Sequence, residues 1–151
     1  MPLIKNGEFV SDTWTQVNDD EKLPDQGAVI VDVARWKAEK VLLKARTTAV
    51  GVRLNADMAL DDICEDLSAI ELVVLAFPAF TDGRAYSAAR TLRDKYAFEG
   101  EIRAVGNVLR DQLAFMVRCG FDAFEVGASV TPTLLQEAIS EIDVFYQPAS
   151  D

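Results

Sequence analysis

Short apolar runs that alternate with amphipathic segments are the feature that most restricts the fold of this 151-residue chain. These runs span residues 28–33, 49–54, 72–77, 101–105 and 121–126. Between them, apolar side chains recur at helical spacing, as in Leu60, Ile63, Cys64 and Leu67. Strands that alternate with helices indicate βα units and a mainly parallel sheet, so the sequence predicts an α/β fold.

The expected helices follow the apolar runs. They lie at about residues 36–43, from a cap at Asn55 or Asp57 through Leu67, at 84–96, after the cap Asn107 and after the cap Thr131. At the N-terminus, Ile4-Lys5 and Glu8-Phe9-Val10 flank an Asn6-Gly7 turn, which predicts a short hairpin. Residues 17–28 are polar and read as a connecting loop.

The length favours one α/β domain over residues 1–151, with the hairpin and loop in 1–27 and the βα core in 28–146. We expect an open, mainly parallel, flavodoxin-like sheet. A partial βα-barrel is the alternative, because a full eight-fold barrel normally needs ~250 residues.

Charge and composition exclude several functions. The net charge of -10 argues against binding to nucleic acid or to anionic membrane surfaces. There is no histidine, and the two cysteines cannot supply the four ligands of an iron–sulfur cluster, so no metal site is expected. No Gly-rich dinucleotide or phosphate loop is present, and no cofactor is evident. Without a signal-like or membrane-spanning segment, the expected location is the cytoplasm.

The candidate site lies at the carboxyl ends of the predicted strands, where ligands bind in parallel α/β sheets. Three loops there open helices and so present free backbone N–H groups to an anion. Their candidate ligand-binding residues are Thr81, Asp82, Gly83, Arg84, Asn107, Arg110, Gln112, Ser129 and Thr131.

Local charge favours the same loops. Residues 82–118 hold seven bases and five acids, a net charge of +2, whereas the rest of the chain carries -12. Six of these bases are arginines, which suit bidentate recognition of oxyanions. One interpretation is an oxyanion pocket in which Arg84 and Arg110 contact the ligand and Asp82 and Asp111 orient them. The other is that the arginines pair with neighbouring acids as part of the fold.

The cysteines and one acidic segment have simpler interpretations. Cys119 is expected at a helix C-terminus, where negative partial charge raises the pKa of a thiol, and we interpret both it and Cys64 as core residues. The acids Asp61, Asp62, Glu65 and Asp66 are expected on the outer face of a helix. That face is either simply solvated or a docking surface for a basic partner.

Several segments together resemble a known bacterial family. They are Phe77-Pro78-Ala79-Phe80-Thr81-Asp82-Gly83-Arg84-Ala85-Tyr86-Ser87, Ala89-Arg90-Thr91-Leu92-Arg93, Gly106-Asn107-Val108-Leu109-Arg110-Asp111-Gln112-Leu113 and Arg118-Cys119-Gly120-Phe121-Asp122-Ala123-Phe124. Between about Val29 and Glu125 the chain is similar to a domain of unknown function encoded beside assimilatory sulfite or nitrite reductase. The resemblance implies a setting in sulfur assimilation and cysteine biosynthesis, and it implies no catalytic residues.

Three functional hypotheses follow. The first is an accessory protein of sulfate and sulfite reduction that binds a small oxyanion or phosphorylated ligand. The second is an enzyme that uses Asp82 or Asp111 for acid–base chemistry, with arginine stabilising developing charge. The third is a docking partner of sulfite reductase or another enzyme of that pathway.

Overall fold

The fold is built on one eight-stranded sheet. The computed structural model describes residues 3–5, 8–18, 20–54, 60, 63–77, 84–106, 110–125, 133 and 137. The strands are β1 (Leu3–Lys5), β2 (Glu8–Val10), β3 (Trp14–Gln16), β4 (Ala28–Asp32), β5 (Val50–Leu54), β6 (Leu72–Phe77), β7 (Glu101–Gly106) and β8 (Ala123–Glu125). Their order across the sheet is β2-β1-β8-β7-β6-β5-β4-β3.

The sheet is mixed but mostly parallel. Strands β3 to β8 are parallel to one another, which confirms the predicted parallel core. Strand β1 pairs antiparallel with β2, as the predicted hairpin requires, and also antiparallel with β8. The hairpin therefore extends the parallel sheet beyond β8.

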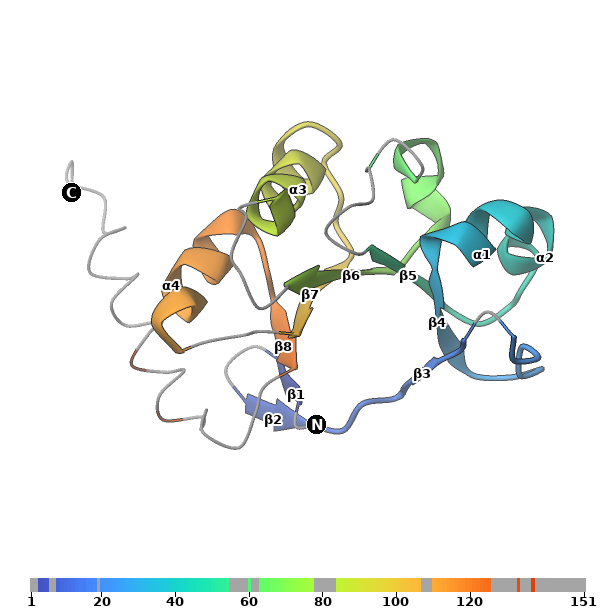
Figure 1. The fold of residues 1–151 in the computed structure, drawn as a ribbon, viewed down its shortest axis with the longest axis horizontal. Coiled ribbons are helices and arrows are strands. Elements are labelled where there is room, and N and C mark those ends of the chain that lie inside the picture. Colours follow the sequence, from blue (N-terminus) through green and yellow to red (C-terminus); the bar gives the residue numbers. More distant parts are fainter. Residues whose placement is uncertain are drawn as a thin grey trace.

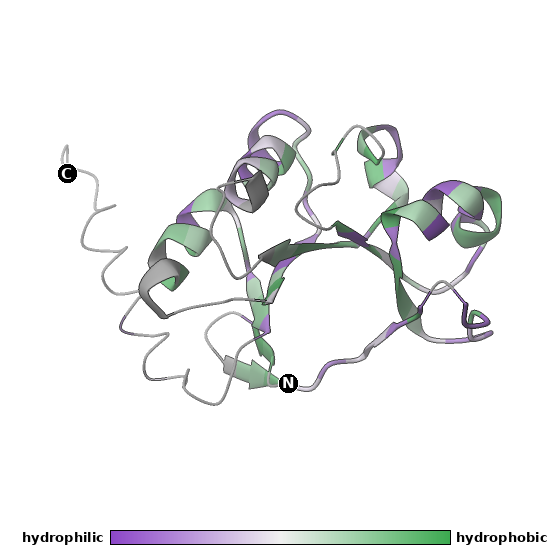
Figure 2. Cartoon of the chain, in the orientation of Figure 1, coloured by the Kyte–Doolittle hydropathy of each residue, from purple (hydrophilic) through white to green (hydrophobic). Residues whose placement is uncertain are grey.

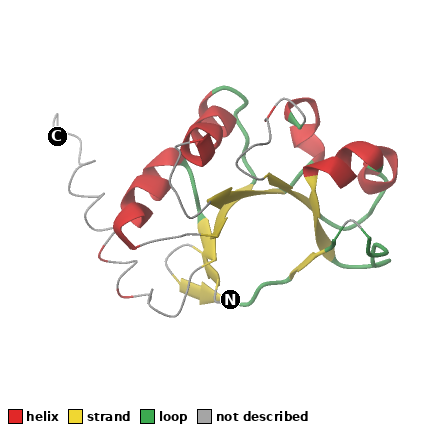
Figure 3. Cartoon of the chain, in the orientation of Figure 1, coloured by secondary structure: helices red, strands yellow, loops and turns green. Residues whose placement is uncertain are grey.

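The sheet curls into a half-barrel with its helices on the outer side (Figure 1). The helices are α1 (Val33–Ala38), α2 (Lys40–Lys44), α3 (Arg84–Asp94) and α4 (Arg110–Cys119), with the 3-10 helix η2 (Cys64–Ala69) between β5 and β6. Figure 3 shows no helix inside the curl among the residues in colour. The flavodoxin-like arrangement is not confirmed: strands β3 to β8 follow one another in chain order, whereas a doubly wound sheet reverses its order and has helices on both faces. The curl is closer to the alternative of a partial βα-barrel.

The main core lies between the outer face of the sheet and the helices. Alternate strand residues face it, including Val31, Val52 and Leu75, and Trp36 and Leu92 pack against them from the helices. Figure 2 shows the hydrophobic colour along the central strands. Among the described residues, the inner face has a smaller apolar cluster of Ile30, Leu72, Val74 and Val105, with Trp14 and Ala76 packed against it. The helix-covered face is therefore the hydrophobic side, and the concave side can hold polar residues.

Two local predictions need correction. Residues 1–27 were predicted to form a hairpin and a loop, but strand β3 lies within them. No apolar run predicts this strand, since Trp14-Thr15-Gln16 is short, partly polar and at the edge of the sheet. The amphipathic helix predicted through Leu67 is a 3-10 helix from Cys64 to Ala69 in the part that the structure describes. The predicted helix after Thr131 lies outside the described residues. None of the helices that the structure describes is long and apolar enough to cross a membrane.

Candidate functional site at the carboxyl edge and on the concave face

The strands that precede two of the three predicted loops, β6 and β7, end side by side. The last residues of β6 and β7, Phe77 and Gly106, are paired in register. The chain returns from these ends as α3, which begins at Arg84, and α4, which begins at Arg110. The two helices are in contact, since the ring centroids of Tyr86 on α3 and Phe115 on α4 lie 4.7 Å apart. Both helix N-termini therefore lie at the carboxyl edge of adjacent strands.

The backbone places four of the predicted site residues. Arg84 opens α3, and Arg110, Asp111 and Gln112 form the first turn of α4. The other candidates lie outside the described residues, so their roles stay predictions: Thr81, Asp82, Gly83, Asn107, Ser129 and Thr131.

One arginine of the basic segment serves the fold. Arg93 donates hydrogen bonds to the carbonyl oxygens of Phe98, Gly100 and Gly120, at 2.7–3.2 Å. These contacts join the end of α3 to the start of β7 and the end of α4. Arg93 therefore fits the interpretation of the arginines as part of the fold.

The concave face carries charged residues that the sequence interpretation missed. Arg53 on β5 and Arg103 on β7 alternate with strand residues whose side chains enter the outer core, so both arginines face inward. They line a cavity of about 180 Å³ together with Asp12, Trp14, Val74 and Glu125. The sequence contained a signal for this inner face. Arg53 and Arg103 each occupy a strand position that alternates with the core-facing apolar residues of β5 and β7.

Arg103 is the buried centre of a charge network. Its side chain is 3% exposed, and its Nε and Nη2 lie 3.2 and 3.1 Å from Oε2 of Glu101. Its Nη1 lies 3.2 Å from Oδ2 of Asp12, in the segment that joins the two edge strands β2 and β3. Lys5 on β1 adds an ion pair of 2.7 Å to Glu101. The network therefore ties β1, β7 and residue 12 together across the inside of the curl.

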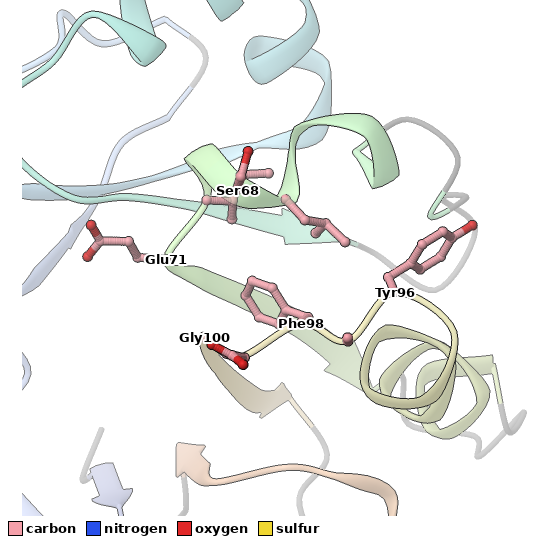
Figure 4. A pocket seen from close by; sticks show the side chains of 9 residues that line it. Ser68, Glu71, Tyr96, Phe98 and Gly100 are labelled. Atoms are coloured by element: carbon pink, nitrogen blue, oxygen red, sulfur yellow. The ribbon is translucent and has the colours of Figure 1, made fainter.

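A second, larger cavity of about 560 Å³ lies at the opposite, amino-terminal edge of the sheet. In Figure 4 the ring of Phe98 lies between Glu71 and Tyr96. Glu71 and Glu99 are the charged residues among its described lining, so it does not suit an anion. A Cβ at Gly100 would lie 2.6 Å from the carbonyl oxygen of Glu71, which explains the glycine there as a close backbone contact. This edge reads as structural, since ligands of parallel sheets bind at the carboxyl ends.

The acidic segment is not a uniform outer face. Asp66 is buried, and its carboxylate oxygens lie 2.7 Å from Nζ of Lys40 and 2.6 Å from Nζ of Lys44. Glu65 is exposed as expected, and Asp61 and Asp62 lie outside the described residues. The prediction was wrong for Asp66 because η2 packs beside α2, whose Lys40 and Lys44 cover this carboxylate. The periodicity of residues 60–67 alone cannot predict a contact with lysines of another segment.

Asp66→Asn should lower the free energy of unfolding at neutral pH by about 1–2 kcal/mol, since two partly exposed ammonium groups lose a charged acceptor. Hydrogen bonds from Lys40 and Lys44 hold the pKa of Asp66 below its ordinary value of 3.8. The contribution is therefore complete above that value and is lost as the pH falls through the lower, folded-state pKa. Urea unfolding should show a constant difference from wild type between about pH 5 and 8 that narrows toward pH 3.

Glu65→Gln is the matched control for Asp66→Asn, because it removes a neighbouring but exposed carboxylate. Its effect should stay within ~0.5 kcal/mol. A difference between wild type and Asp66→Asn that grows toward low pH would contradict the assignment.

Both cysteines are free thiols, and Cys119 is the last residue of α4 and is buried. Burial raises the pKa of its thiol, and the charges of Arg90 and Arg118 offset part of this effect. The predicted direction is confirmed, although burial and not the helix end is the main cause. Among the described residues, no group of three or more acidic or cysteine side chains could hold a metal ion.

The fold and the inner face define an α/β half-barrel protein with a charged concave cavity and two arginine-headed helices at the carboxyl edge of its sheet. The chain belongs to DUF934, a family of bacterial proteins of unknown function, which matches residues 51–151. The matched part includes Arg53, Arg103 and the first residues of α3 and α4. No curated protein matches the sequence.

Proposed function

We propose that this protein binds a small oxyanion or phosphorylated ligand at the carboxyl edge of its sheet, as an accessory factor of assimilatory sulfate and sulfite reduction. The pairing of Phe77 with Gly106 carries the proposal. From these paired ends the chain reaches Arg84 and Arg110, the first residues of two neighbouring helices.

The chemistry of this edge favours a negative charge. The first turns of α3 and α4 have backbone N–H groups without partners inside the helix, and the positive ends of both helix dipoles lie there. An arginine at the first position of each helix adds a full positive charge and several donors. A tetrahedral oxyanion offers oxygens to both sets of donors at once.

The biological setting comes from the resemblance to proteins encoded beside sulfite reductase. The substrate of sulfite reductase and its metabolic precursors are oxyanions or phosphosulfates. These match the ligand class that the helix ends favour. The ligands to test are therefore sulfate, sulfite, phosphate and adenosine phosphosulfates.

Thermal unfolding of the full chain tests the proposal. A ligand of this class at ten times its Kd should raise Tm by about 3–5 °C. Arg84→Ala/Arg110→Ala should abolish the shift while leaving the unliganded Tm close to that of wild type. A further readout is isothermal titration with the ligand that gives the largest shift.

Arg90→Ala/Arg118→Ala is the matched control, since it removes the same charge from exposed positions further along the same two helices. This control should keep the ligand-induced shift. The proposal fails if none of the four ligands changes Tm, or if both double variants respond alike.

A further inference from the structure

Two charges on the concave face are not used by the network around Arg103. Arg53 and Glu125 line the cavity and are half-buried. Within the described part of the chain, the side chain of neither residue forms a hydrogen bond or an ion pair, although Asp32 lies beside Arg53 in register on β4. A half-buried charge without a direct hydrogen-bonding partner loses hydration that no contact replaces.

The other charged residues of the cavity already have partners. Arg103 is bonded to Glu101 and Asp12 through all three of its guanidinium nitrogens. The second carboxylate oxygen of Asp12 accepts a hydrogen bond from the backbone N–H of Trp14, at 3.0 Å. A ligand therefore meets one open cation, Arg53, and one open anion, Glu125.

These two groups come from different walls of the curl. Arg53 lies on β5 and Glu125 on β8, with β6 and β7 between them. At ~4.8 Å per strand this is ~14 Å along the sheet, too far for a direct pair on a flat surface. The curl places both on one cavity, with the ring of Trp14 and the side chains of Val74 and Val105 as its apolar lining.

The cavity volume of about 180 Å³ suits a small molecule. A molecule of that size with two opposite charges and a short apolar part matches the lining.

We infer that the concave cavity binds a small zwitterion of the α-amino-acid type. Arg53 receives the carboxylate, Glu125 receives the ammonium group, and the short side chain packs against Trp14 and Val74. An anion alone would leave Glu125 without a partner, and a cation alone would leave Arg53 without one. The residues of this site differ from those of the oxyanion site at the starts of α3 and α4.

Isothermal titration of the full chain with glycine, L-alanine, L-serine and L-valine tests the inference. At least one should bind with a Kd below ~1 mM, and propionate and ethylamine, which carry one charge each, should bind at least about tenfold more weakly. L-Tryptophan, which has a much larger side chain, should bind more weakly than L-alanine.

Arg53→Gln and Glu125→Gln should each weaken the binding of the best amino acid about tenfold or more, because each leaves one ligand charge unmatched. Neither residue has a partner among the described residues, so the unliganded Tm of both variants should stay near that of wild type. Arg90→Gln and Glu65→Gln are the matched controls, because they make the same charge changes at exposed positions. Both controls should bind as wild type does.

Three results would overturn the inference: no amino acid binds, propionate binds as well as L-alanine, or the Arg53 and Glu125 variants bind as wild type does. Arg84→Ala/Arg110→Ala should leave amino-acid binding unchanged. The outcome is therefore independent of the oxyanion test.

Discussion

Trp36→Ala is expected to lower the free energy of unfolding by about 3–5 kcal/mol, the usual range for truncating a large aromatic side chain in a core. Trp36 lies on α1, is fully buried and belongs to the cluster that joins the helices to the outer face of the sheet. Its removal leaves a cavity that the parallel strands beneath cannot fill without breaking register. Guanidinium unfolding followed by circular dichroism measures the loss, since the fluorescence itself changes with the substitution.

Trp36→Phe separates the ring from its N–H group. The indole Nε1 is buried without a hydrogen-bond partner among the residues that the structure describes, so phenylalanine gives up no polar contact. The expected loss is about 1–2 kcal/mol, from the smaller ring alone. If Trp36→Phe costs as much as Trp36→Ala, the N–H group has a partner and this account of the core is wrong.

The parallel core could be predicted from the sequence because its strands are buried. The run Leu72-Val73-Val74-Leu75-Ala76-Phe77 has apolar residues on both faces, and a buried run of this kind is typical of a parallel strand. The hairpin was predictable for a local reason too, since a two-residue turn fixes its register. Both signals lie within a few neighbouring residues.

The curl and strand β3 depend on contacts between distant residues. Trp14 pairs in register with Ala28, and the polar stretch around it contains no periodic signal of a strand. Asp12 contacts Arg103, 91 residues away, and such a pair leaves no local pattern. The choice between an open sheet and a half-barrel therefore could not be made from segment periodicity.

The candidate site divides in the same way. The starts of α3 and α4 were predictable, because an arginine at the head of a helix after an apolar strand is a local pattern. The concave cavity was not, because Arg53 and Glu125 come together only through the curl of the sheet. The alternation of side chains in β5 and β7 does place Arg53 and Arg103 on the face opposite the core. This alternation was the one usable sequence signal for the concave cavity.

Arg103→Met is the second substitution with a large expected effect. Methionine fills a similar length of side chain, so the change removes the charge with little loss of volume. Glu101, whose side chain is only 10% exposed, keeps Lys5 as its partner, and Asp12 turns to water. The free energy of unfolding should fall by about 3 kcal/mol, the lower end of the range for breaking a buried ion pair.

The double variant Arg103→Met/Glu101→Met tests whether the loss comes from the buried carboxylate of Glu101, which keeps only Lys5 as a partner. Replacing both members of a buried pair by apolar side chains is often neutral, so the double variant should regain most of the ~3 kcal/mol lost by Arg103→Met alone. Asp12→Ala should cost only about 1 kcal/mol, because Asp12 is 39% exposed. Losses that simply add in the double variant would show that Arg103 and Glu101 are not coupled, and that the inner face is held by packing and not by this charge network.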